Sequence, residues 1–277
     1  MGTRPMSGGP DGAMNRPGEH RSTTTGEGSQ QRELRAGELR LGIGSLCRPT
    51  HVDLDPSELG PGSQLSRYAS SFETAELTAS LDASPAETEL RSLADDTPDG
   101  FLFAVAVQEV ELTPETPRRM VQLLDHLQAA LGEKLGPVLL EIEDEGSAEQ
   151  LVETLAGLPP FDRWAVELPS PLSTPRVLSF LRERAIALCL SERRDGPSSR
   201  EVTAPHIYVA LREPTMPRRD RWDGQSIVGW ACALKSWLDD GREVFCYLDV
   251  ADAAGMLEDL RALRRMTSGT ADELDCP

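Results

Sequence analysis

The chain reads Phe101-Leu-Phe-Ala-Val-Ala-Val107, then a polar segment of helix length, then Pro137-Val-Leu-Leu-Glu-Ile142. An apolar run without alternation is typical of a strand that is covered on both faces, as in the parallel sheets of α/β proteins. Between the two runs, apolar residues recur at helical spacing. This stretch therefore predicts two neighbouring parallel strands joined by an amphipathic helix.

The same alternation continues along most of the chain. Eight β-type runs occur, at residues 39–45, 73–78, 101–107, 136–142, 163–168, 185–190, 206–211 and 243–248. Helices are expected at residues 84–95, 113–131, 147–157, from 174 onward, 224–239 and 252–266. Eight strands alternating with helices predict an α/β fold, a TIM-type (β/α)8 barrel with parallel strands. The alternative is an open doubly wound sheet, against which the lack of a glycine-rich first turn argues.

Composition sets the expected limits of the barrel. Residues 1–38 are rich in Gly, Ser, Thr, Pro and Arg and hold almost no large apolar side chain, which predicts a disordered N-terminal tail. The barrel is expected at residues 39–266, followed by a flexible C-terminal tail at 267–277. Its first and sixth connections, at residues 46–62 and 191–205, are expected to be irregular, the sixth without a helix.

Charge and cysteine usage restrict the function classes. The chain has 28 basic and 46 acidic residues and a net charge of −18, which disfavours general nucleic-acid binding. It contains no apolar run long enough to cross a membrane and no signal-like N-terminus, so a cytoplasmic protein is expected. The five cysteines are widely spaced and lack a Cys-x-x-Cys pair, which indicates reduced thiols.

Acidic residues follow several of the predicted strands. In a barrel the carboxyl ends of the strands form the functional face, so acids there are candidates for catalysis or for holding a divalent cation. The catalytic candidates are Glu76, Glu141, Glu167 and Asp249, and Glu192 lies just past the sixth strand. The alternative is that these acids only form a solvated rim. None of the four histidines lies near these strand ends to share a catalytic or metal-binding role.

A group of arginines follows the seventh strand. Barrels commonly bind phosphate in this region, and the planar guanidinium suits a phosphate group. The ligand-binding candidates are Arg212, Arg218 and Arg219, with Arg221 nearby. They predict a small-molecule or phosphorylated ligand, unless they only pair with Glu213, Asp220 and Asp223 in a solvated loop. The residues identify no cofactor and no particular metal, and they leave any protein partner unknown.

Four motifs in this order resemble the YecE-like family, the domain of unknown function 72. The motifs are Thr97-Pro-Asp-Gly-Phe-Leu-Phe-Ala-Val105, Leu131-Gly-Glu-Lys-Leu-Gly-Pro-Val-Leu-Leu140, Trp164-Ala-Val-Glu167 and Gly241-Arg-Glu-Val-Phe-Cys-Tyr247. The resemblance covers residues 39 to 266. It implies a TIM-type barrel, in agreement with the strand pattern, and it implies no established biochemical activity.

The chain departs from the family pattern mainly at polar positions. Glu76 and Glu167 keep the family's acids. The departures are Gly42-Ile-Gly-Ser-Leu46 for the usual Gly-Thr-Ser-Gly-Trp, Ala106 for Lys, Glu141 for Gln, Pro169-Ser170 for Arg-His, Ala210 for Arg, and Asp249-Val250 for an Asn or Asp followed by Asn. Most of these changes remove cationic or amide groups, which are the donors that stabilise an anionic substrate.

Two functions stay open at this point. The first is a divergent, non-catalytic member that binds a small ligand or a protein partner. The alternative is a metal-assisted hydrolase or isomerase that uses the carboxylates at the C-terminal face of the barrel. The sequence does not decide whether the protein is an enzyme.

Overall fold

The strands of the protein form one sheet that curls into a nearly closed barrel. The computed structural model describes residue 1 and residues 37–44, 64–142, 146–193, 196–197, 200–212, 224–249 and 253–268. Its strands are β1 (Leu39–Ile43), β2 (Thr74–Ser80), β3 (Leu102–Val110), β4 (Leu135–Ile142), β5 (Trp164–Glu167), β6 (Ala187–Arg193), β7 (Gly196–Pro197), β8 (His206–Arg212) and β9 (Glu243–Asp249). The order is β1-β9-β8-β6-β5-β4-β3-β2, all neighbours being parallel, and β7 pairs antiparallel with β6. The predicted (β/α)8 barrel is confirmed.

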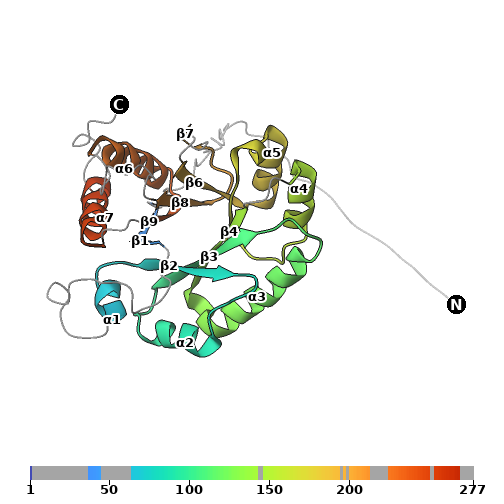
Figure 1. Cartoon of the computed structure of the whole chain (residues 1–277), viewed down its shortest axis with the longest axis horizontal. Helices are drawn as coiled ribbons and strands as arrows, with labels where there is room; N and C mark the ends of the chain where they lie inside the picture. Colours follow the sequence, from blue (N-terminus) through green and yellow to red (C-terminus); the bar gives the residue numbers. More distant parts are fainter. Residues whose placement is uncertain are drawn as a thin grey trace. The chain divides into compact units, whose positions relative to one another are not determined.

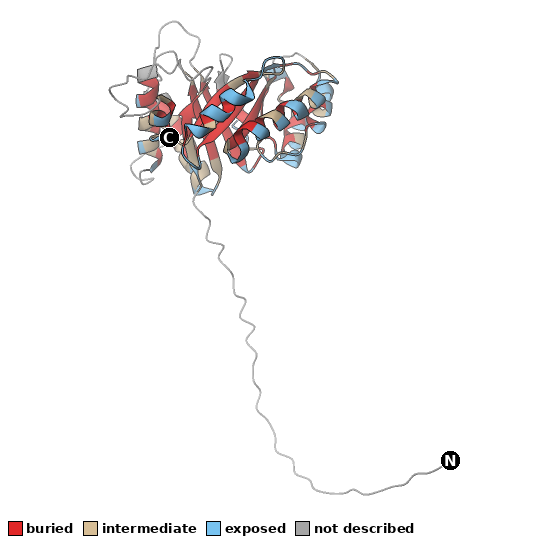
Figure 2. Cartoon of the chain, turned by 90° about the horizontal axis from the view of Figure 1, so that it is seen from below, coloured by how far each residue is buried: buried red, intermediate tan, exposed pale blue. Residues whose placement is uncertain are grey.

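Helices surround the strands on the outside (Figure 1). They are α1 (Gln64–Ala69), α2 (Glu87–Asp95), α3 (Thr116–Leu131), α4 (Ala148–Ala156), α5 (Pro175–Arg184), α6 (Gly224–Asp239) and α7 (Ala253–Ser268), with short 3-10 turns η1 (Gly132–Lys134) and η2 (Ser170–Leu172). Figure 2 shows buried strands inside and exposed outer helix faces. Within the described residues, no helix combines the length and the apolar character that a membrane crossing requires.

The helix starts follow from local sequence. Ser147 caps α4 by accepting a hydrogen bond from the Gln150 amide, and the Gln150 side chain accepts one from the Ser147 amide at 2.8 Å. Thr174 caps α5, and Pro175 occupies its first helical position. The third helix begins at Thr116 rather than at residue 113, because the Thr116 hydroxyl donates to the Glu111 carbonyl at 2.7 Å and holds the preceding residues in a turn.

The connections and ends differ in detail from the expected ones. The sixth connection contains β7 and, in its described part, no helix, as expected. Residues 46–62 of the first connection lie outside the described residues, and the short helix α1 that follows them was not predicted. Contacts with the barrel already begin at Gly37, whose amide donates to the Leu238 carbonyl at 2.9 Å, and α7 continues to Ser268.

The described cysteines are of two kinds. Cys189 and Cys246 are free and buried in strands, as the sequence indicates. Cys232 on α6 is disulfide-bonded. The expectation that all thiols are reduced is therefore wrong for Cys232.

The inside of the barrel is packed by large side chains facing small ones. Buried aromatic rings project from β8 and β9, and the Tyr208 and Tyr247 ring centroids are 5.1 Å apart. The residues that share this inner cluster are Leu102, Ala104, Ala106, Leu139, Ala165, Ala187, Cys189, Ala204, Tyr208, Ala210, Phe245 and Tyr247. The alanines on β3, β5, β6 and β8 make room for the rings, as close packing in a protein interior requires.

A tyrosine hydroxyl joins the two ends of the sheet. β1 and β2 come so close that a Cβ on Gly42 would lie 2.2 Å from the Thr74 carbonyl oxygen, so only glycine fits there. The buried Tyr68 hydroxyl, from α1, accepts a hydrogen bond from the Ile43 amide at 2.9 Å and donates one to the Thr74 carbonyl at 2.7 Å. One side-chain oxygen thus takes the place of a ladder bond between β1 and β2.

Charged groups and a histidine lie at the N-terminal ends of several strands. Arg40 Nε and an Arg163 guanidinium nitrogen lie 3.4 and 3.6 Å from a Glu243 carboxylate oxygen. His206 is only 4% exposed, and its Nε2 has no hydrogen-bond partner among the described residues. Burial, helped by the positive charge of Arg163, lowers the pKa of His206 to about 4 against the opposing effects of the Trp164 backbone and Asp162.

The Tyr68 hydroxyl that bridges β1 and β2, at what we call the seam of the barrel, predicts the effect of Tyr68→Phe. Removing the hydroxyl leaves the Ile43 amide and the Thr74 carbonyl buried without this partner, which we expect to lower the free energy of unfolding by roughly 1–3 kcal/mol. Urea unfolding measures this loss. Tyr247→Phe is the matched control and should cost less, because the Thr74 hydroxyl keeps its bond to the Leu102 carbonyl. Equal stability of Tyr68→Phe and the wild type would contradict the bridging role.

The buried histidine predicts a pH dependence. Because the pKa of His206 is lower in the folded than in the unfolded chain, its contribution to stability is present above about pH 6.5. It is lost as the pH falls from there to about 4, by at most roughly 3 kcal/mol. His206→Gln should remove this part of the pH profile in urea unfolding, whereas His126→Gln on α3 should leave it. A profile unchanged in His206→Gln would show that other groups cause it.

Candidate functional site

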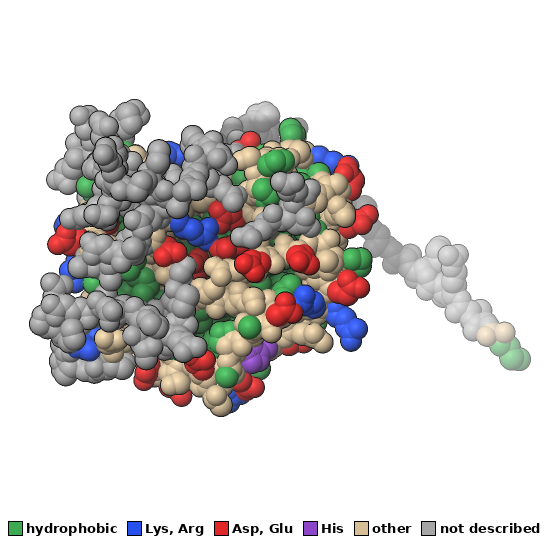
Figure 3. Space-filling view, in the orientation of Figure 1, with side chains coloured by type: hydrophobic (Ala, Val, Ile, Leu, Met, Phe, Trp, Pro, Cys, Tyr) green, Lys and Arg blue, Asp and Glu red, His purple; other side chains and the backbone are tan. Residues whose placement is uncertain are grey.

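Ionisable side chains meet near the carboxyl ends of the strands. The strand register places residues of neighbouring strands directly beside each other there. Glu141 on β4 pairs with Glu167 on β5, and Arg212 on β8 pairs with Asp249 on β9. Glu76 lies on β2 and is buried. We call the side chains of Glu76, Glu141, Glu167, Tyr208, Arg212 and Asp249 the acidic mouth. In the orientation of Figure 1, acidic and basic side chains gather near the middle of the visible face (Figure 3).

The centre of the acidic mouth is an arginine held between two glutamates. One guanidinium nitrogen of Arg212 donates to Glu167 and another donates to Glu141. The side chains of Arg212, Glu141 and Glu167 are 30%, 15% and 8% exposed. Burial alone would lower the pKa of Arg212, but the two carboxylates outweigh burial and raise it. Arg212 is therefore a permanent cation whose charge is shared by two acids.

A serine completes the bonding of Glu167. Ser191 on β6 is buried, and its hydroxyl donates to Glu167 Oε1 at 2.9 Å. Arg212 bonds to the other oxygen, Oε2. Both oxygens of Glu167 are thus held in place, which gives the carboxylate a defined orientation.

Glu76 forms a second polar pair, deeper in the barrel. It is 2% exposed, and the Tyr208 hydroxyl donates to its Oε2. Burial, followed by the negative charge of Glu76, raises the pKa of Tyr208 well above its usual value. A Cβ on Gly44 would lie 3.0 Å from the Asp249 Cβ and 3.4 Å from Glu76 Oε1, so the end of β1 leaves space next to both acids.

The nucleophilic groups near the acidic mouth stay protonated. Burial, and next the charge of Glu167, raises the pKa of the Cys189 thiol well above its usual value. A thiol needs an electropositive, partly exposed setting to form the reactive thiolate, and Cys189 is buried in the apolar inner cluster, where Arg212 does not outweigh burial and the charge of Glu167. Neither Cys189 nor Tyr208 is set up to attack a substrate.

The predicted site residues have different outcomes. Glu141, Glu167 and Arg212 come together, and Arg212 bonds to both acids. Arg218 and Arg219 lie outside the described residues. The described residues contain no group of three or more His, Cys, Asp or Glu that could hold a metal ion. The catalytic and ligand-binding roles stay predictions.

Sequence reasoning missed Ser191 and Tyr208. Both point into the barrel, as their inward neighbours Cys189 and Ala210 do, at every second position of β6 and β8. Period-two spacing along a strand was the available signal. Their partners come from other strands, at sequence separations of 24 and 132 residues, so the contacts themselves could not be foreseen.

Comparison with known proteins agrees with this architecture. The family model described as "Protein of unknown function DUF72" matches residues 41–275. The chain belongs to the DUF72 family. No curated protein sequence matches the chain.

Solved DUF72 structures share the fold. A DUF72 family protein from Thermotoga maritima superimposes with a TM-score of 0.67 at 14% identity, covering 84% of this chain and 100% of that one. A DUF72 family protein from Enterococcus faecalis gives a TM-score of 0.61 at 16% identity, covering 84% and 99%. At this identity the likeness establishes the fold alone.

Two alanines mark where the acidic mouth departs from the DUF72 motifs. Ala106 on β3 and Ala210 on β8 stand where the family resemblance leads us to expect Lys and Arg, and both are buried inside the barrel. Neither can supply a positive charge. The described part of the acidic mouth is therefore poorer in cations than the family pattern implies.

The charge sharing around Arg212 predicts the effect of Arg212→Met. The change removes the guanidinium that pairs with the partly buried Glu141 and Glu167, and we expect the free energy of unfolding at pH 7 to fall by roughly 2–3 kcal/mol, since a paired charge is lost at a site that solvent still reaches. Urea unfolding measures it. Adding Glu141→Gln to Arg212→Met should restore part of the loss. A double variant as unstable as the sum of the two single variants would contradict the coupling.

Proposed function

We propose that this DUF72 chain is a binding protein whose acidic mouth takes a small ligand that is neutral or positively charged and rich in hydroxyl or amino groups. The observation that carries the proposal is the Arg212 guanidinium held between Glu141 and Glu167. The pairing neutralises the arginine and holds the two carboxylates in fixed orientations at the end of the barrel.

The charge of the acidic mouth supports this ligand class. Among the described residues, the strands bring four carboxylates, from Glu76, Glu141, Glu167 and Asp249, to the same part of the barrel as the Arg212 guanidinium. An excess of negative charge in a partly buried site repels anions and attracts cations. The positions of Ala106 and Ala210 contribute no charge that would reverse this preference.

Binding without catalysis is favoured by the state of the reactive groups. The pKa values of Cys189 and Tyr208 are raised, so neither supplies an anionic nucleophile near neutral pH. Glu141 and Glu167 both bond to Arg212, and no group of metal-ligating side chains exists among the described residues. The metal-assisted hydrolase or isomerase thus has no specific observation in its favour.

A small ligand is also favoured over a protein partner that docks on an apolar patch. In the described part of the chain, Met1 and Val121 are the large apolar side chains that are mostly exposed, which favours a small ligand over a partner that docks on protruding apolar side chains. We retain a cytoplasmic location and weak affinity for nucleic acids as parts of this proposal, on the basis of the net charge of −18.

Isothermal titration calorimetry with three related sugars tests the ligand class. Glucosamine carries an ammonium group, glucose is neutral, and glucose 6-phosphate is anionic. At pH 7 and low salt we expect saturable binding that is tightest for glucosamine, weaker for glucose and undetectable for glucose 6-phosphate. The order should follow from charge, because the three probes share the sugar ring.

Glu141→Gln tests where the probe binds. We expect this change to weaken glucosamine binding about tenfold, because it removes one carboxylate of the acidic mouth while it keeps the side-chain shape. Glu133→Gln, with the same charge change in η1 at the other end of β4, is the matched control and should bind as the wild type. The proposal is overturned if glucose 6-phosphate binds most tightly or if none of the three sugars shows saturable binding. It is also overturned if Glu141→Gln and Glu133→Gln have equal effects on glucosamine binding.

A further inference from the structure

The Arg212 guanidinium lies where a cation can face two carboxylates at once. Arg212 is the last residue of β8, and two of its nitrogens bond to different acids, one to Glu167 on β5 and one to Glu141 on β4. The flat, forked guanidinium suits such a bridge. A cationic group of a ligand that approaches both carboxylates therefore meets Arg212 in this place.

The Arg212 side chain is more accessible to solvent than those of its two partners. An arginine side chain is long and has many rotamers, so its guanidinium can turn toward solvent while the backbone of β8 stays in place. The bridge to Glu141 and Glu167 is therefore one that a competing cation can open from the solvent side.

The two carboxylates stay side by side when the guanidinium leaves. Glu141 and Glu167 are register partners on paired strands. The buried Ser191 hydroxyl holds Glu167 Oε1 at 2.9 Å, whereas Arg212 bonds to the other oxygen. Both glutamates also have further interactions within the chain, so their places depend on more than Arg212.

We propose that Arg212 is an internal cation that sets the specificity of the acidic mouth, and that an ammonium or guanidinium group of the ligand takes its place between Glu141 and Glu167. This role rests on the proposed binding of cationic ligands. Because Arg212 belongs to the same chain, it competes at a high effective concentration. A neutral ligand does not compete with the guanidinium and binds beside the intact bridge.

Titration calorimetry of the full chain with Arg212→Met tests the competition. Methionine keeps much of the apolar stem and leaves the place of the guanidinium. We expect Arg212→Met to bind glucosamine at least tenfold more tightly than the wild type and to bind glucose equally well. If Arg212 only supported the two carboxylates, the variant would bind both sugars more weakly, and that result would overturn the proposal.

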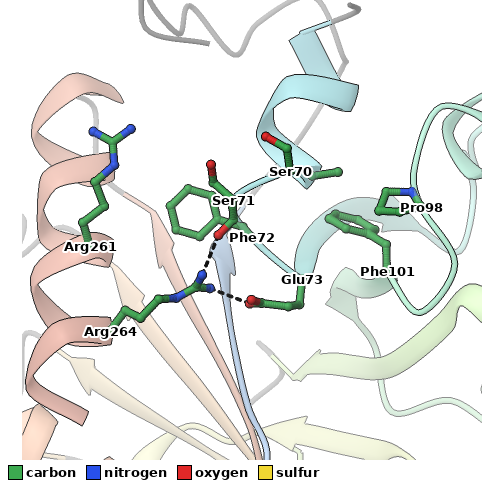
Figure 4. A pocket seen from close by; sticks show the side chains of 9 residues that line it. Ser70, Ser71, Phe72, Glu73, Pro98, Phe101, Arg261 and Arg264 are labelled. Carbon is green, nitrogen blue, oxygen red and sulfur yellow. Dashed lines mark hydrogen bonds and ion pairs between the residues drawn. The ribbon is translucent and has the colours of Figure 1, made fainter. Parts of the chain in front are cut away.

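Arg264→Met is the matched control. Arg264 on α7 lines a separate cavity of about 390 Å³ near the starts of β2 and β3, and it donates to the Ser71 carbonyl at 2.6 Å and to Glu73 Oε2 at 2.5 Å (Figure 4). The change removes a carboxylate-bonded guanidinium of similar exposure away from the acidic mouth. It should leave glucosamine binding as in the wild type. An equal gain in both variants would show that the loss of any positive charge suffices, against the proposal.

Methylguanidinium tests the place between the carboxylates without a sugar. Its shape and charge match the group that Arg212→Met removes. We expect Arg212→Met to bind it saturably, and the wild type and Arg264→Met to bind it at least tenfold more weakly. Adding Glu141→Gln to Arg212→Met should weaken this binding at least tenfold, because one of the two carboxylates is lost. Absence of saturable binding by Arg212→Met refutes the proposed place.

A measurement on the wild type follows the guanidinium directly, because Arg212→Met is expected to be less stable. The side-chain NMR signals of Arg212 can be identified by their absence in Arg212→Lys. They should shift on saturation with glucosamine and stay in place on saturation with glucose. Unchanged signals with glucosamine bound would contradict the exchange.

The sugar-binding proposal and the role of Arg212 can fail separately. If no sugar binds the wild type but methylguanidinium binds Arg212→Met, the sugar class is wrong and the place for a cation stands. If the sugars bind the wild type in the expected order but Arg212→Met gains no affinity for glucosamine, the competition with Arg212 is wrong and the proposed function stands.

Discussion

The barrel depends on one hydroxyl group at the seam between its first two strands. Every other neighbouring pair of the eight parallel strands has a backbone ladder, whereas β1 and β2 are joined by the Tyr68 oxygen, which bonds to Ile43 on one side and Thr74 on the other. Gly42 permits the close approach because it has no Cβ. This closure brings the end of β1 beside Glu76 and Asp249. The Tyr68 ring also packs against the rings of Phe72 and Phe101. The closure of the sheet and the packing of these two rings thus rely on the same residue.

At each end of the barrel, one arginine side chain bonds to groups from other segments of the chain. At the acidic mouth, Arg212 is shared by two glutamates, and acids stay in excess. At the cavity between α7 and the starts of β2 and β3, Arg264 is bonded to Glu73 and to the Ser71 carbonyl. In each case a paired arginine holds together segments that are distant in the sequence.

Part of the acidic mouth was predictable from the strands. Glu141 and Glu167 sit late in two apolar runs that the sequence places side by side, so their proximity follows from parallel register. The role of Arg212 did not follow, because its nearest acids in the sequence lie in the loop after β8, whereas its partners in the structure are 45 and 71 residues away. Ser191 and Tyr208 were missed for the same reason. A hydroxyl inside a strand is visible in the sequence, but its partner depends on how strands close around the barrel axis.

The sequence by itself determined the kind of fold, because runs of apolar residues at strand length and helices at 3.6-residue spacing can bury their surfaces only as a parallel sheet with helices outside. It also determined which residues reach the ends of the strands. Only the tertiary structure decided which of them pair, where the sheet closes, and that a cavity with aromatic and arginine walls forms between α7 and the starts of β2 and β3. Burial patterns are local and repeat along the chain, whereas hydrogen bonds and ion pairs require atoms from distant segments to meet within about 3 Å. That condition is set by the packing of the whole barrel.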